Sequence, residues 1–530
     1  MRITKKLNLF PWNLGIDRTS MPGAQDPRSL YLADNIIFEN NGSRKKFYGV
    51  KDLNLTSQQI GIPQAICQFV ATYNTAPKIE ILRVINGRIE KTVDNEFVDI
   101  TGDAEIHPTD IVSISRFSNT AIFFFENTKP YYYTIGADQV EELGIFDSHK
   151  LSPPRFGRVH DFRLVYAGRG DNPHILTLSA PDNPFSYTLA SGGLSISVRD
   201  GDGDPKGING ISPTFRGELY VFKYSSIYKI YGSPYGYGVA DFCDDIGTVA
   251  HDTICSINND VYWVSNRGIH SLQSTDKFGS VEEATLTFPI YNYFQDNVNW
   301  ELAGRMKASY DQQSNCYLLN YASKFSPYND SLIGINTLTK QIFEVKNGDF
   351  TNLCQVIDYE NKKRKTIYLS NLNGDIGVLR RGYLKWFDDG IPLKIWTGII
   401  FPTQNPSHVV TFTKMKLIVK PTLIDSEIVI SYEIDNYQQG TEQLNLIAGG
   451  YGAVIGDINS IIGGNEEESR ILGPNKDVLI KTININGVGS CISVKIDHDP
   501  SEENLEQDIE IYGLIIEYEY NEDKDGDINI

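Results

Sequence analysis

The stretch that indicates the fold runs Lys78-Ile79-Glu80-Ile81-Leu82-Arg83-Val84-Ile85-Asn86-Gly87, an alternating segment that ends in a tight-turn dipeptide. Alternation with period two is typical of a strand that turns one face to a core, and Asn-Gly suits a two-residue hairpin loop. Similar strands occur at 218–223, 260–264 and 414–420, and further Asn-Gly pairs at 209–210, 347–348, 373–374 and 486–487. No convincing helical pattern exceeds about three turns. The sequence therefore predicts an all-β protein.

Apolar strand-like segments recur at an interval of about 45 residues, which is the length of one four-stranded propeller blade. They lie at 66–71, 111–115, 159–167, 211–222, 254–264, 306–317 and 353–357. The repeats share no WD dipeptide or kelch diglycine, so the period depends on strand spacing only. It predicts a β-propeller of about seven blades between residues 56 and 390. Six or eight blades, or an array of β-sandwiches, are the alternatives.

The texture changes after residue 390, where longer alternating strands are joined by wider polar loops. We predict four segments: an N-terminal strand or arm at 1–55, the propeller-like body at 56–390, a C-terminal β-sandwich at 391–520 and an acidic tail at 521–530. The net charge of −19 is unevenly divided between them. Residues 391–530 hold 9 basic and 23 acidic side chains, whereas the first fifty hold 8 basic and 4 acidic ones.

Composition excludes several classes of function. An acidic chain of this size does not hold nucleic acid or an anionic membrane by general charge attraction. No apolar run approaches the roughly 18 residues of a membrane span, and no apolar run follows the basic residues 1–6, so no secretory signal is expected. The six cysteines lack CxxC spacing and are interpreted as buried free thiols of a reducing compartment: Cys67, Cys243, Cys255, Cys316, Cys354 and Cys491.

Catalytic signatures are absent from the sequence: there is no GxSxG elbow, no HExxH, no phosphate-binding GxxxxGK[ST], and no GxGxxG that opens a helix. The eight histidines include no pair four residues apart, and His251 and His270, which flank one predicted blade, are interpreted as structural. We therefore name no catalytic, cofactor-binding or metal-binding residue and expect no cofactor. A carboxylate pair for glycoside hydrolysis would remain hidden at this level.

Three short patterns suggest ligands but fit turns better. Residues 200–204 alternate Asp and Gly as calcium loops do, but Pro205 and Ile211 stand where such a loop has its glycine and its bidentate glutamate. Residues 521–526 match the first half of such a loop, but the chain ends before a glutamate can follow. Arg169-Gly170-Asp171 spells an adhesion tripeptide and is interpreted as a hairpin tip.

A longer motif is more informative. Residues 21–49 read Met21-Pro-Gly-Ala-Gln-Asp-Pro-Arg-Ser-Leu-Tyr-Leu-Ala-Asp-Asn35-Ile-Ile-Phe-Glu-Asn-Asn-Gly42-Ser-Arg-Lys-Lys-Phe-Tyr-Gly49, with related stretches at 208–232, 246–250 and 261–269. An Asn-bearing strand, a glycine turn, a basic pair and a further glycine follow one another in this motif. The chain here resembles the packaged-DNA stabilisation and tail-nozzle proteins of short-tailed phages. The likeness covers roughly residues 15–50 and 155–290.

This resemblance implies a non-enzymatic virion protein, assembled in the host cytoplasm as a homohexameric ring below the portal and adaptor. Such a ring extends the DNA channel, helps retain packaged DNA, allows its ejection and contacts tail fibre or spike proteins. Double-stranded DNA would pass without tight binding, beside carboxylates in at least part of the bore, and no membrane insertion is implied. The basic stretch Arg44-Lys45-Lys46 is expected to meet an acidic neighbour, a DNA phosphate or solvent.

Two other functions are kept as alternatives. A propeller-type tail protein that binds or cleaves host-surface glycans would use exposed aromatic rings, for which Tyr131-Tyr132-Tyr133 and Tyr235-Gly-Tyr237 are candidates. Packing in a core or an interface explains these tyrosines equally well. The other alternative is a cellular propeller scaffold without any link to a virus.

Overall fold

The chain forms two compact units. The structure is a computed structural model that describes residues 2–10, 12–21, 23–39, 42–73, 76–144, 152–201, 203–204, 207–233, 236–273, 275, 285–360, 364–422, 426–435, 437–446, 478–500, 505 and 507–521. The propeller unit comprises Val50–Leu338 and Lys346–Arg380, and the terminal unit comprises Met1–Gly49, Thr339–Val345 and Arg381–Ile530. The predicted boundaries at 55 and 390 thus differ from the observed ones, and the first 49 residues belong with the C-terminal strands.

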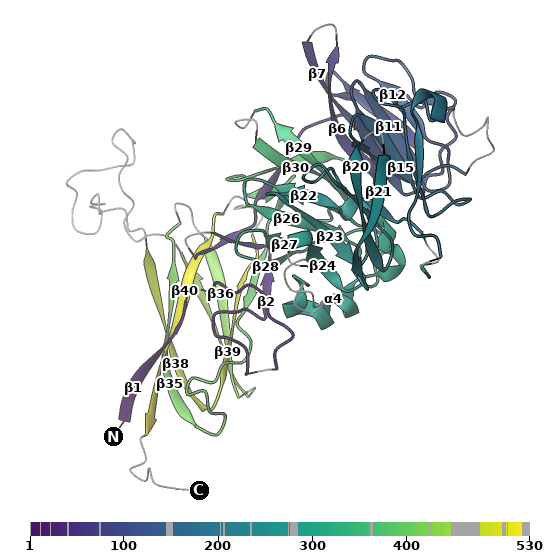
Figure 1. The fold of residues 1–530 in the computed structure, drawn as a ribbon. Coiled ribbons are helices and arrows are strands. Elements are labelled where there is room, and N and C mark those ends of the chain that lie inside the picture. Colours follow the sequence, from purple (N-terminus) through teal and green to yellow (C-terminus); the bar gives the residue numbers. More distant parts are fainter. Residues whose placement is uncertain are drawn as a thin grey trace. The chain divides into compact units, whose positions relative to one another are not determined.

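Seven antiparallel sheets make up the described part of the propeller unit (Figure 1). In chain order the blades are β6 (Pro63–Tyr73), β7 (Ala76–Ile85), β8 (Arg88–Val93) and β9 (Glu96–Asp99); β10 (Val112–Phe117), β11 (Thr120–Phe125), β12 (Tyr131–Thr134) and β13 (Glu141–Glu142); β14 (Phe156–His160), β15 (Arg163–Ala167), β16 (Ile175–Leu178) and β17 (Leu194–Ser197); β18 (Gly210–Ile211), β19 (Leu219–Phe222), β20 (Ser226–Ser233) and β21 (Gly236–Asp244); β22 (Cys255–Ile257), β23 (Asp260–Ser265) and β24 (Gly268–Ser271); β25 (Lys307–Asp311), β26 (Cys316–Tyr321) and β27 (Ser331–Asn336); and β29 (Asn352–Asp358), β30 (Arg364–Ser370) and β31 (Ile376–Arg380).

First strands of neighbouring blades lie beside one another from β6 to β18 and from β22 to β29. Strand β18 contacts residues 251–253, which directly precede β22, and β29 lies beside β6, so the ring of sheets is closed. The core fills the spaces between neighbouring blades. Phe69 and Phe123 belong to a buried cluster shared by blades 1 and 2, and the rings of Phe222 and Trp263 lie 5.2 Å apart between blades 4 and 5. Because the predicted period marks the start of each blade, the β-propeller prediction is confirmed.

Three of the five predicted hairpin turns are wrong. One of them, Asn347-Gly348, connects Ile342–Val345 to Asn352–Asp358, which belong to different sheets. Asn86 and Gly87 have φ of 51° and 72° and join β7 to β8 as an Asn-Gly loop should. Asn209-Gly210, by contrast, lies at the start of β18, where a Cβ on Gly210 would come within 2.6 Å of the Ile254 side chain. Gly487 lies inside β38 (Leu479–Gly489), opposite a bulge. At Gly210 glycine permits close packing, and in neither place does it reverse the chain.

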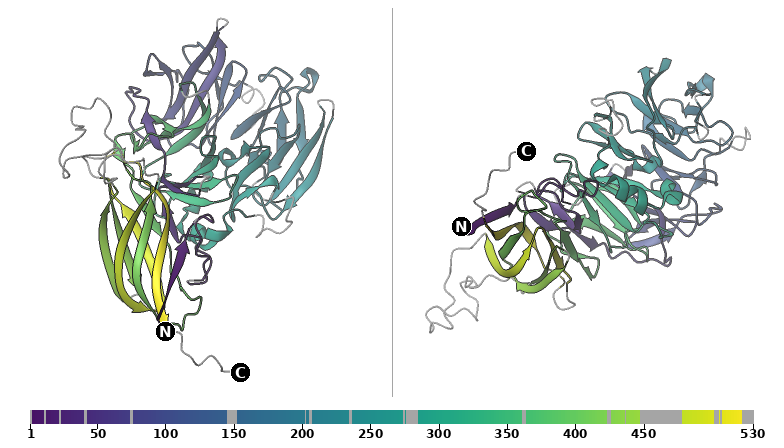
Figure 2. Two further views of the ribbon diagram at one scale, coloured as in Figure 1. Left: turned by 90° about the vertical axis from the view of Figure 1, so that its left-hand side faces the viewer. Right: turned by 90° about the horizontal axis from the view of Figure 1, so that it is seen from below.

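The terminal unit contains the long strands that the sequence predicted after residue 390 (Figure 2). One sheet has the order β3 (Ile36–Phe38), β4 (Arg44–Lys46), β40 (Glu510–Asn521), β35 (Val410–Val419) and β38, with β1 (Arg2–Leu9) also paired to β40. The other strands run β28 (Ile342–Val345), β2 (Leu32–Asp34), β34 (Leu393–Trp396), β39 (Ile492–His498), β36 (Glu427–Ile434) and β37 (Gln438–Asn445), and a short pair is formed by β32 (Lys385–Trp386) and β33 (Asp389–Gly390).

The N-terminal residues are part of this unit's sheets. Strand β1 pairs with β40 along its whole length, from Arg2 opposite Asn521 to Leu9 opposite Leu514. Side chains of β35 alternate between buried and less buried positions, as expected for a strand with one face in a core. The β-sandwich assignment of residues 391–520 stays a prediction. The predicted acidic tail, apart from Asn521, lies outside the described residues.

Among the described residues, helical structure occurs in short segments between strands. The elements with given bounds are the 3-10 turns η1 (Leu189–Ser191), η2 (His251–Thr253), η3 (Phe288–Ile290) and η4 (Trp300–Arg305) and the α-helix α4 (Tyr291–Asn297), and residues 272, 273 and 275 are helical as well. Within the described ranges, no helix is both long and apolar enough to cross a bilayer.

The ring closes between blades 7 and 1 through backbone-like contacts. The side-chain amide of Gln68 in β6 accepts from the Ile357 N–H at 2.8 Å and donates to the Ile357 carbonyl at 3.0 Å, as a paired strand residue would. Strand β5 (Gly49–Asp52), which precedes blade 1 in the chain, lies next to β31 of blade 7. Leu53 continues this pairing through a 3.0 Å hydrogen bond to the Ile376 carbonyl. Residues before β6 and residues within β6 are therefore both hydrogen-bonded to the last blade.

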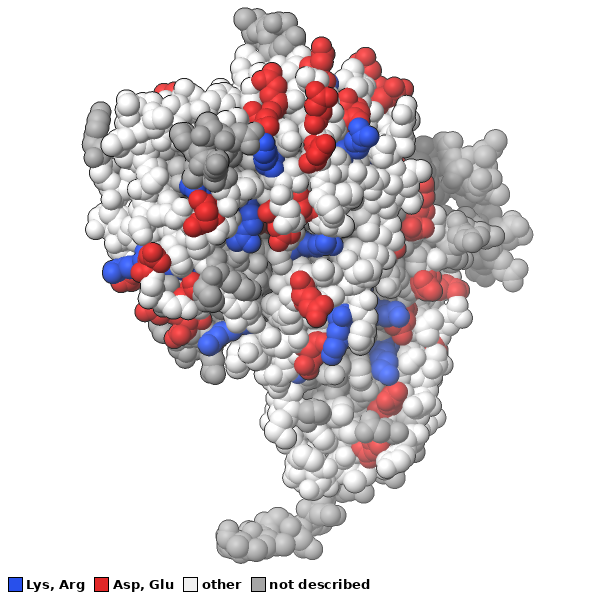
Figure 3. Space-filling view, turned by 90° about the vertical axis from the view of Figure 1, so that its right-hand side faces the viewer, with Lys and Arg blue, Asp and Glu red and all other residues white. Residues whose placement is uncertain are grey.

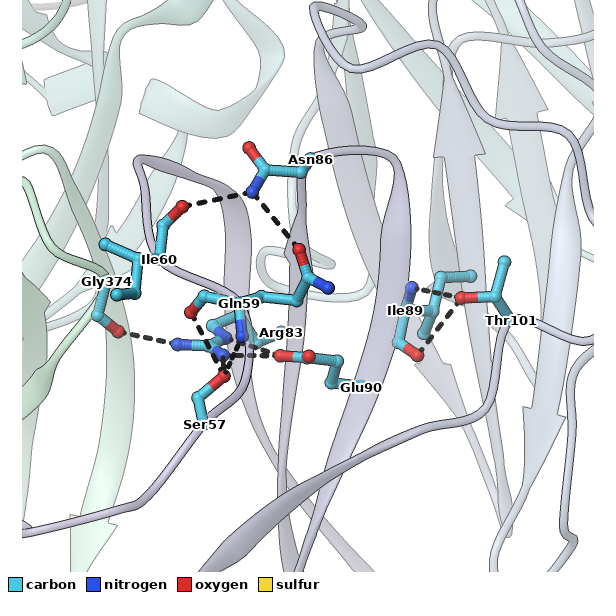
Figure 4. A network of polar contacts seen from close by, with 9 residues as sticks. All are labelled: Ser57, Gln59, Ile60, Arg83, Asn86, Ile89, Glu90, Thr101 and Gly374. Carbon is cyan, nitrogen blue, oxygen red and sulfur yellow. Dashed lines mark hydrogen bonds and ion pairs between the residues drawn. The ribbon is translucent and has the colours of Figure 1, made fainter.

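A buried ion pair reinforces the same closure (Figure 4). Arg83 of β7 binds the Glu90 carboxylate through Nε at 3.0 Å, and its Nη1 donates to the Gly374 carbonyl of blade 7 at 2.7 Å. Its Nη2 contacts Ser57, which lies between β5 and β6. The guanidinium lies 3.9 Å from the centre of the Phe97 ring. Burial raises the pKa of Glu90, and the Arg83 charge opposes that rise. One side chain thus connects blade 1, blade 7 and the segment that joins them.

Replacing Arg83 with methionine is expected to lower the unfolding free energy by about 3–5 kcal/mol, because Glu90 would remain buried without its partner. Arg88→Ala is the matched control: Arg88 pairs with Asp99 at 3.1 Å on the same blade, but both side chains are about half exposed. It should change stability by no more than about 1 kcal/mol. Urea unfolding followed by tryptophan fluorescence measures both, and equal losses in the two variants would contradict the closure role of Arg83.

Candidate functional site

A pocket of about 640 Å³ in the propeller unit lies where the inner strands of blades 2 to 5 begin. Ile111 and Ser113 of blade 2, Phe156 of blade 3, Asn209 at β18 and residues 249–252 before β22 contribute to its wall. Inner strands surround the axis of a propeller, so this pocket lies at one end of the axis. A smaller pocket of about 180 Å³, between blades 1, 2, 6 and 7, shares Ile111 with it.

The remaining wall comes from the helical segment between blades 5 and 6, which supplies Gln295, Trp300, Glu301, Ala303 and Gly304. Its sequence explains the short turns. Pro289 stands in the first turn of η3, where a missing N–H has no cost. The Asn299 side chain accepts from the Glu301 N–H at 3.2 Å and caps η4. The cap holds Trp300 and Glu301 at the pocket.

His251 is fixed in its neutral form. Its ring stacks on Phe156, with centroids 4.6 Å apart and planes 14° from parallel. Its Nδ1 accepts from the Ile211 N–H at 3.2 Å, which places the proton of the neutral ring on Nε2. Burial and the charge of Arg158 lower the pKa of His251 to about 3. At neutral pH this imidazole is uncharged, and its acceptor nitrogen is already bonded to the Ile211 N–H of the neighbouring blade.

Asp252 is held beside His251 by partners from two other blades. Its Oδ1 accepts from the Ser113 hydroxyl at 2.8 Å, and its Oδ2 lies 3.7 Å from the Lys307 ammonium. Burial tends to raise the pKa of Asp252, but Lys307 and the other nearby donors outweigh it and keep the pKa below its usual value. Asp252 therefore stays ionised and contributes a fixed negative charge.

Lys307 is the buried cation of the propeller axis. From β25 it donates to the carbonyls of Gln64 at 3.0 Å and Val112 at 3.1 Å, in addition to its contact with Asp252. Burial lowers the pKa of Lys307, and Asp252 opposes this effect. Blades 1, 2, 5 and 6 are thus connected at one ammonium group, directly behind the pocket.

Exposed polar groups complete the lining. The carboxylates of Glu126 and Glu301 are exposed, and Arg155 is half-buried with Nε 3.1 Å from the Gly168 carbonyl. Burial lowers the pKa of Arg155, and the charge of Glu126 partly offsets this. Among the residues that the structure describes, no three His, Cys, Asp or Glu side chains gather closely enough to hold a metal ion. The pocket combines aromatic rings, amides and carboxylates, which suits binding of a polar ligand.

The basic stretch has a different environment from a solvated hairpin. Arg44 and Lys46 are fully buried in the terminal unit, and Lys45 forms an ion pair with Asp508 at 3.0 Å. Burial lowers the pKa of Lys46 to about 8, and its Nζ lies 3.3 Å from Nε2 of His498. Contact with DNA phosphate is therefore wrong for Arg44 and Lys46. Sequence reasoning missed this because side chains of one short strand alternate in burial.

The other short patterns take part in local structure. Asp204 accepts from the Tyr224 and Ser225 N–H groups, so its carboxylate caps a turn, whereas Asp202 and Pro205 lie outside the described residues. Arg169 is buried and paired with Asp171, unlike an accessible adhesion tip. The Ser265 hydroxyl lies 2.7 Å from Nε2 of His270, as expected of a structural histidine.

The tyrosine cluster and the cysteines also serve packing. Tyr133 is fully buried and donates to Glu80 at 2.8 Å, and the Tyr132 ring lies 4.8 Å from Phe185. Tyr235 is outside the described residues. All six cysteines are free, and burial raises the pKa of Cys255 and Cys354 to about 12, which keeps these thiols protonated.

Comparisons with known proteins identify no relative by sequence. No family model matches the chain, and no curated protein matches it. Among solved structures it is similar to the extracellular domain of a one-component system from B. thetaiotaomicron (11% identity, TM-score 0.40), of which it spans only 43% while 69% of this chain is covered. It is also similar to YCF48 bound to a D1 peptide, at 9% identity and a TM-score of 0.39, with 65% of this chain and 98% of that chain covered. A third similar structure is the C-terminal WD40 domain of Sif2, at 10% identity and a TM-score of 0.33, with 64% of this chain and 99% of that chain covered. Such remote likenesses carry no information on function.

The neutral state of His251 makes a pH prediction. The unfolded chain protonates this histidine below about pH 6.5, whereas the folded chain does so only near pH 3, so its contribution to stability is complete above 6.5 and is lost as the pH falls. Going from pH 8 to pH 5 should therefore cost about 2 kcal/mol through this residue.

His251→Asn keeps an acceptor near the Ile211 N–H but does not titrate. Urea midpoints of the two proteins at pH 8 and pH 5 provide the measurement, and the variant should lose less stability on acidification by about the same 2 kcal/mol. An identical pH dependence in both proteins would show that His251 is not held neutral.

Proposed function

We propose that this protein is a structural, non-enzymatic component of a short-tailed phage tail, of the nozzle type, which forms a ring below the portal and adaptor. In this role it extends the channel through which double-stranded DNA leaves, and helps to retain the packaged DNA. The ring carries six copies and contacts tail fibre or spike proteins. It is assembled in the host cytoplasm and remains in the virion tail.

The observation that supports this proposal is the structural use of the phage-like motif. Asn35 has a positive φ of 59°, and its backbone bonds to the Glu344 carbonyl and the Phe47 N–H at 2.8 Å each. A Cβ on Gly49 would lie 2.5 Å from the backbone of Tyr383. Two residues of the phage-like motif, Asn35 and Gly49, therefore occupy positions where the backbone conformation or a close neighbour restricts the side chain.

Arg44 supplies the centre of the same arrangement. Its guanidinium lies 5.7 Å from the Trp12 ring and 5.1 Å from the Phe38 ring, and it contacts the Gly42 carbonyl. Together with the β1–β40 pairing, these contacts hold both ends of the described chain in one unit. Such a firmly held body suits a subunit of a closed ring, in which each copy meets the next through a heterologous interface.

Surface charge is compatible with DNA that passes by and is not held. Figure 3 shows Asp and Glu gathered over part of one face, with Lys and Arg scattered among them. On blades 1 and 2 the exposed cationic side chains are Arg88 and Arg116, whereas the exposed carboxylates are Asp94, Glu96, Asp99, Asp103, Glu105, Glu126, Asp138 and Glu141. Like charge between such a surface and phosphate prevents adhesion.

Native mass spectrometry and negative-stain imaging of the full chain test the proposed assembly. A six-membered ring is expected, either in solution or after addition of the portal and adaptor of the same phage, because closure by rotation needs a fixed copy number. A monomer that fails to bind that complex would contradict the proposal.

Binding to DNA is a separate test. Fluorescence anisotropy with a short random duplex at physiological salt should give a Kd weaker than about 10⁻⁴ M, because the described basic side chains are mostly paired or buried. Micromolar binding that weakens steeply with salt would show that this protein holds DNA directly, as a clamp and not as a channel wall.

A further inference from the structure

We infer that the axial pocket is a binding site for a short, neutral oligosaccharide. This inference goes beyond the structural role proposed above and does not depend on it. A volume of about 640 Å³ lies within the roughly 300–1,000 Å³ typical of small-molecule sites, and several polar groups converge on it.

Aromatic rings supply the first part of the recognition. Trp300 is half-buried at the pocket wall, and its Nε1 donates to the Gln295 carbonyl at 3.1 Å. Its ring meets Phe294 edge-on, with centroids 5.6 Å apart, which restrains its orientation. Tyr224, also half-buried, lines the pocket from blade 4. Rings of this kind combine a large apolar face with a polar group, which suits the C–H face and hydroxyl rim of a sugar.

Planar polar groups supply the second part. The Asn209 amide donates to the Thr248 carbonyl at 2.7 Å, and the Gln295 amide donates to the Asn266 carbonyl at 2.8 Å. These bonds fix both amides with their oxygens as acceptors. The carboxylates of Glu126 and Glu301 add further acceptors, and the Arg155 guanidinium adds donors. Hydroxyl groups both donate and accept, so they match such a mixed set of partners.

Charge favours a neutral ligand. The carboxylates that line the pocket are Glu126, Asp252 and Glu301, and the lining cation is Arg155, with Lys307 behind Asp252. An acidic sugar or a phosphate would face more carboxylates than cations. Lys307 offsets the charge of Asp252, and Arg155 and Glu126 offset one another, so the lining offers little net charge to a cationic ligand. A polar ligand without charge avoids both costs of desolvation and repulsion.

Saturation-transfer-difference NMR on the full chain tests this inference. The probes are neutral trisaccharides at millimolar concentration, drawn from α- and β-glucans, galactans, mannans and chitin, with sialyllactose as the acidic comparison. At least one neutral probe should show saturation transfer and a Kd measurable by titration, and sialyllactose should not bind. No transfer to any neutral probe, or transfer to sialyllactose only, would overturn the inference.

Variants locate the site. Trp300→Ala is expected to weaken binding about tenfold or more through loss of the stacking ring. Glu301→Ala, at an exposed position that should not affect folding, is expected to weaken it severalfold. Tyr359→Ala is the matched control, since Tyr359 is an exposed aromatic residue outside the pocket. Circular dichroism verifies that each variant folds. Equal affinity of Glu301→Ala and wild type, together with equal affinity of Trp300→Ala if it folds, would place the ligand elsewhere.

Discussion

A propeller depends on the joint between its last and first blades, because every other neighbouring pair is continuous in the chain. In this protein three different contacts make that joint. The Gln68 amide pairs with the Ile357 backbone as a strand residue would, β5 adds to blade 7, and Arg83 connects Glu90 with Gly374. An amide, a strand and a buried ion pair differ in their response to salt and pH, so the closure does not depend on one type of interaction.

The closed ring creates the axial environment in which Lys307 and the pocket occur. Inner strands that meet around an axis present backbone carbonyls there, and a buried ammonium is stable only if several of these groups surround it. Lys307 uses carbonyls of blades 1 and 2 and the Asp252 carboxylate. With these contacts made, Asp252 keeps its negative charge at the pocket floor, beside the neutral ring of His251. The helical segment at 288–305 then supplies the one wall that the blades do not provide.

Much of the fold was predictable from local pattern. Alternation identified the strands, and a spacing of about 45 residues identified blades that begin at β6, β10, β14, β18, β22, β25 and β29. The turn at Asn86-Gly87 was predictable for the same local reason. The position of Asn209-Gly210 at the start of a strand was not predictable, because its glycine leaves room for the Ile254 side chain from the next blade. The burial of Arg44 and Lys46 was equally hidden, since the Trp12 ring beside Arg44 and the Gln507 carbonyl bound by Lys46 come from distant segments.

The sequence by itself determined the all-β class, the blade period and the change of texture after residue 390, because these follow from the spacing of apolar side chains along a strand. It also determined the segregation of acidic residues toward the C-terminus. Only the tertiary structure decided that the first 49 residues join the C-terminal strands. It alone brought Phe156, Asn209, His251 and Trp300 to one pocket. The physical reason is that a pocket at a propeller axis takes one or two residues from each blade, so no local motif contains it.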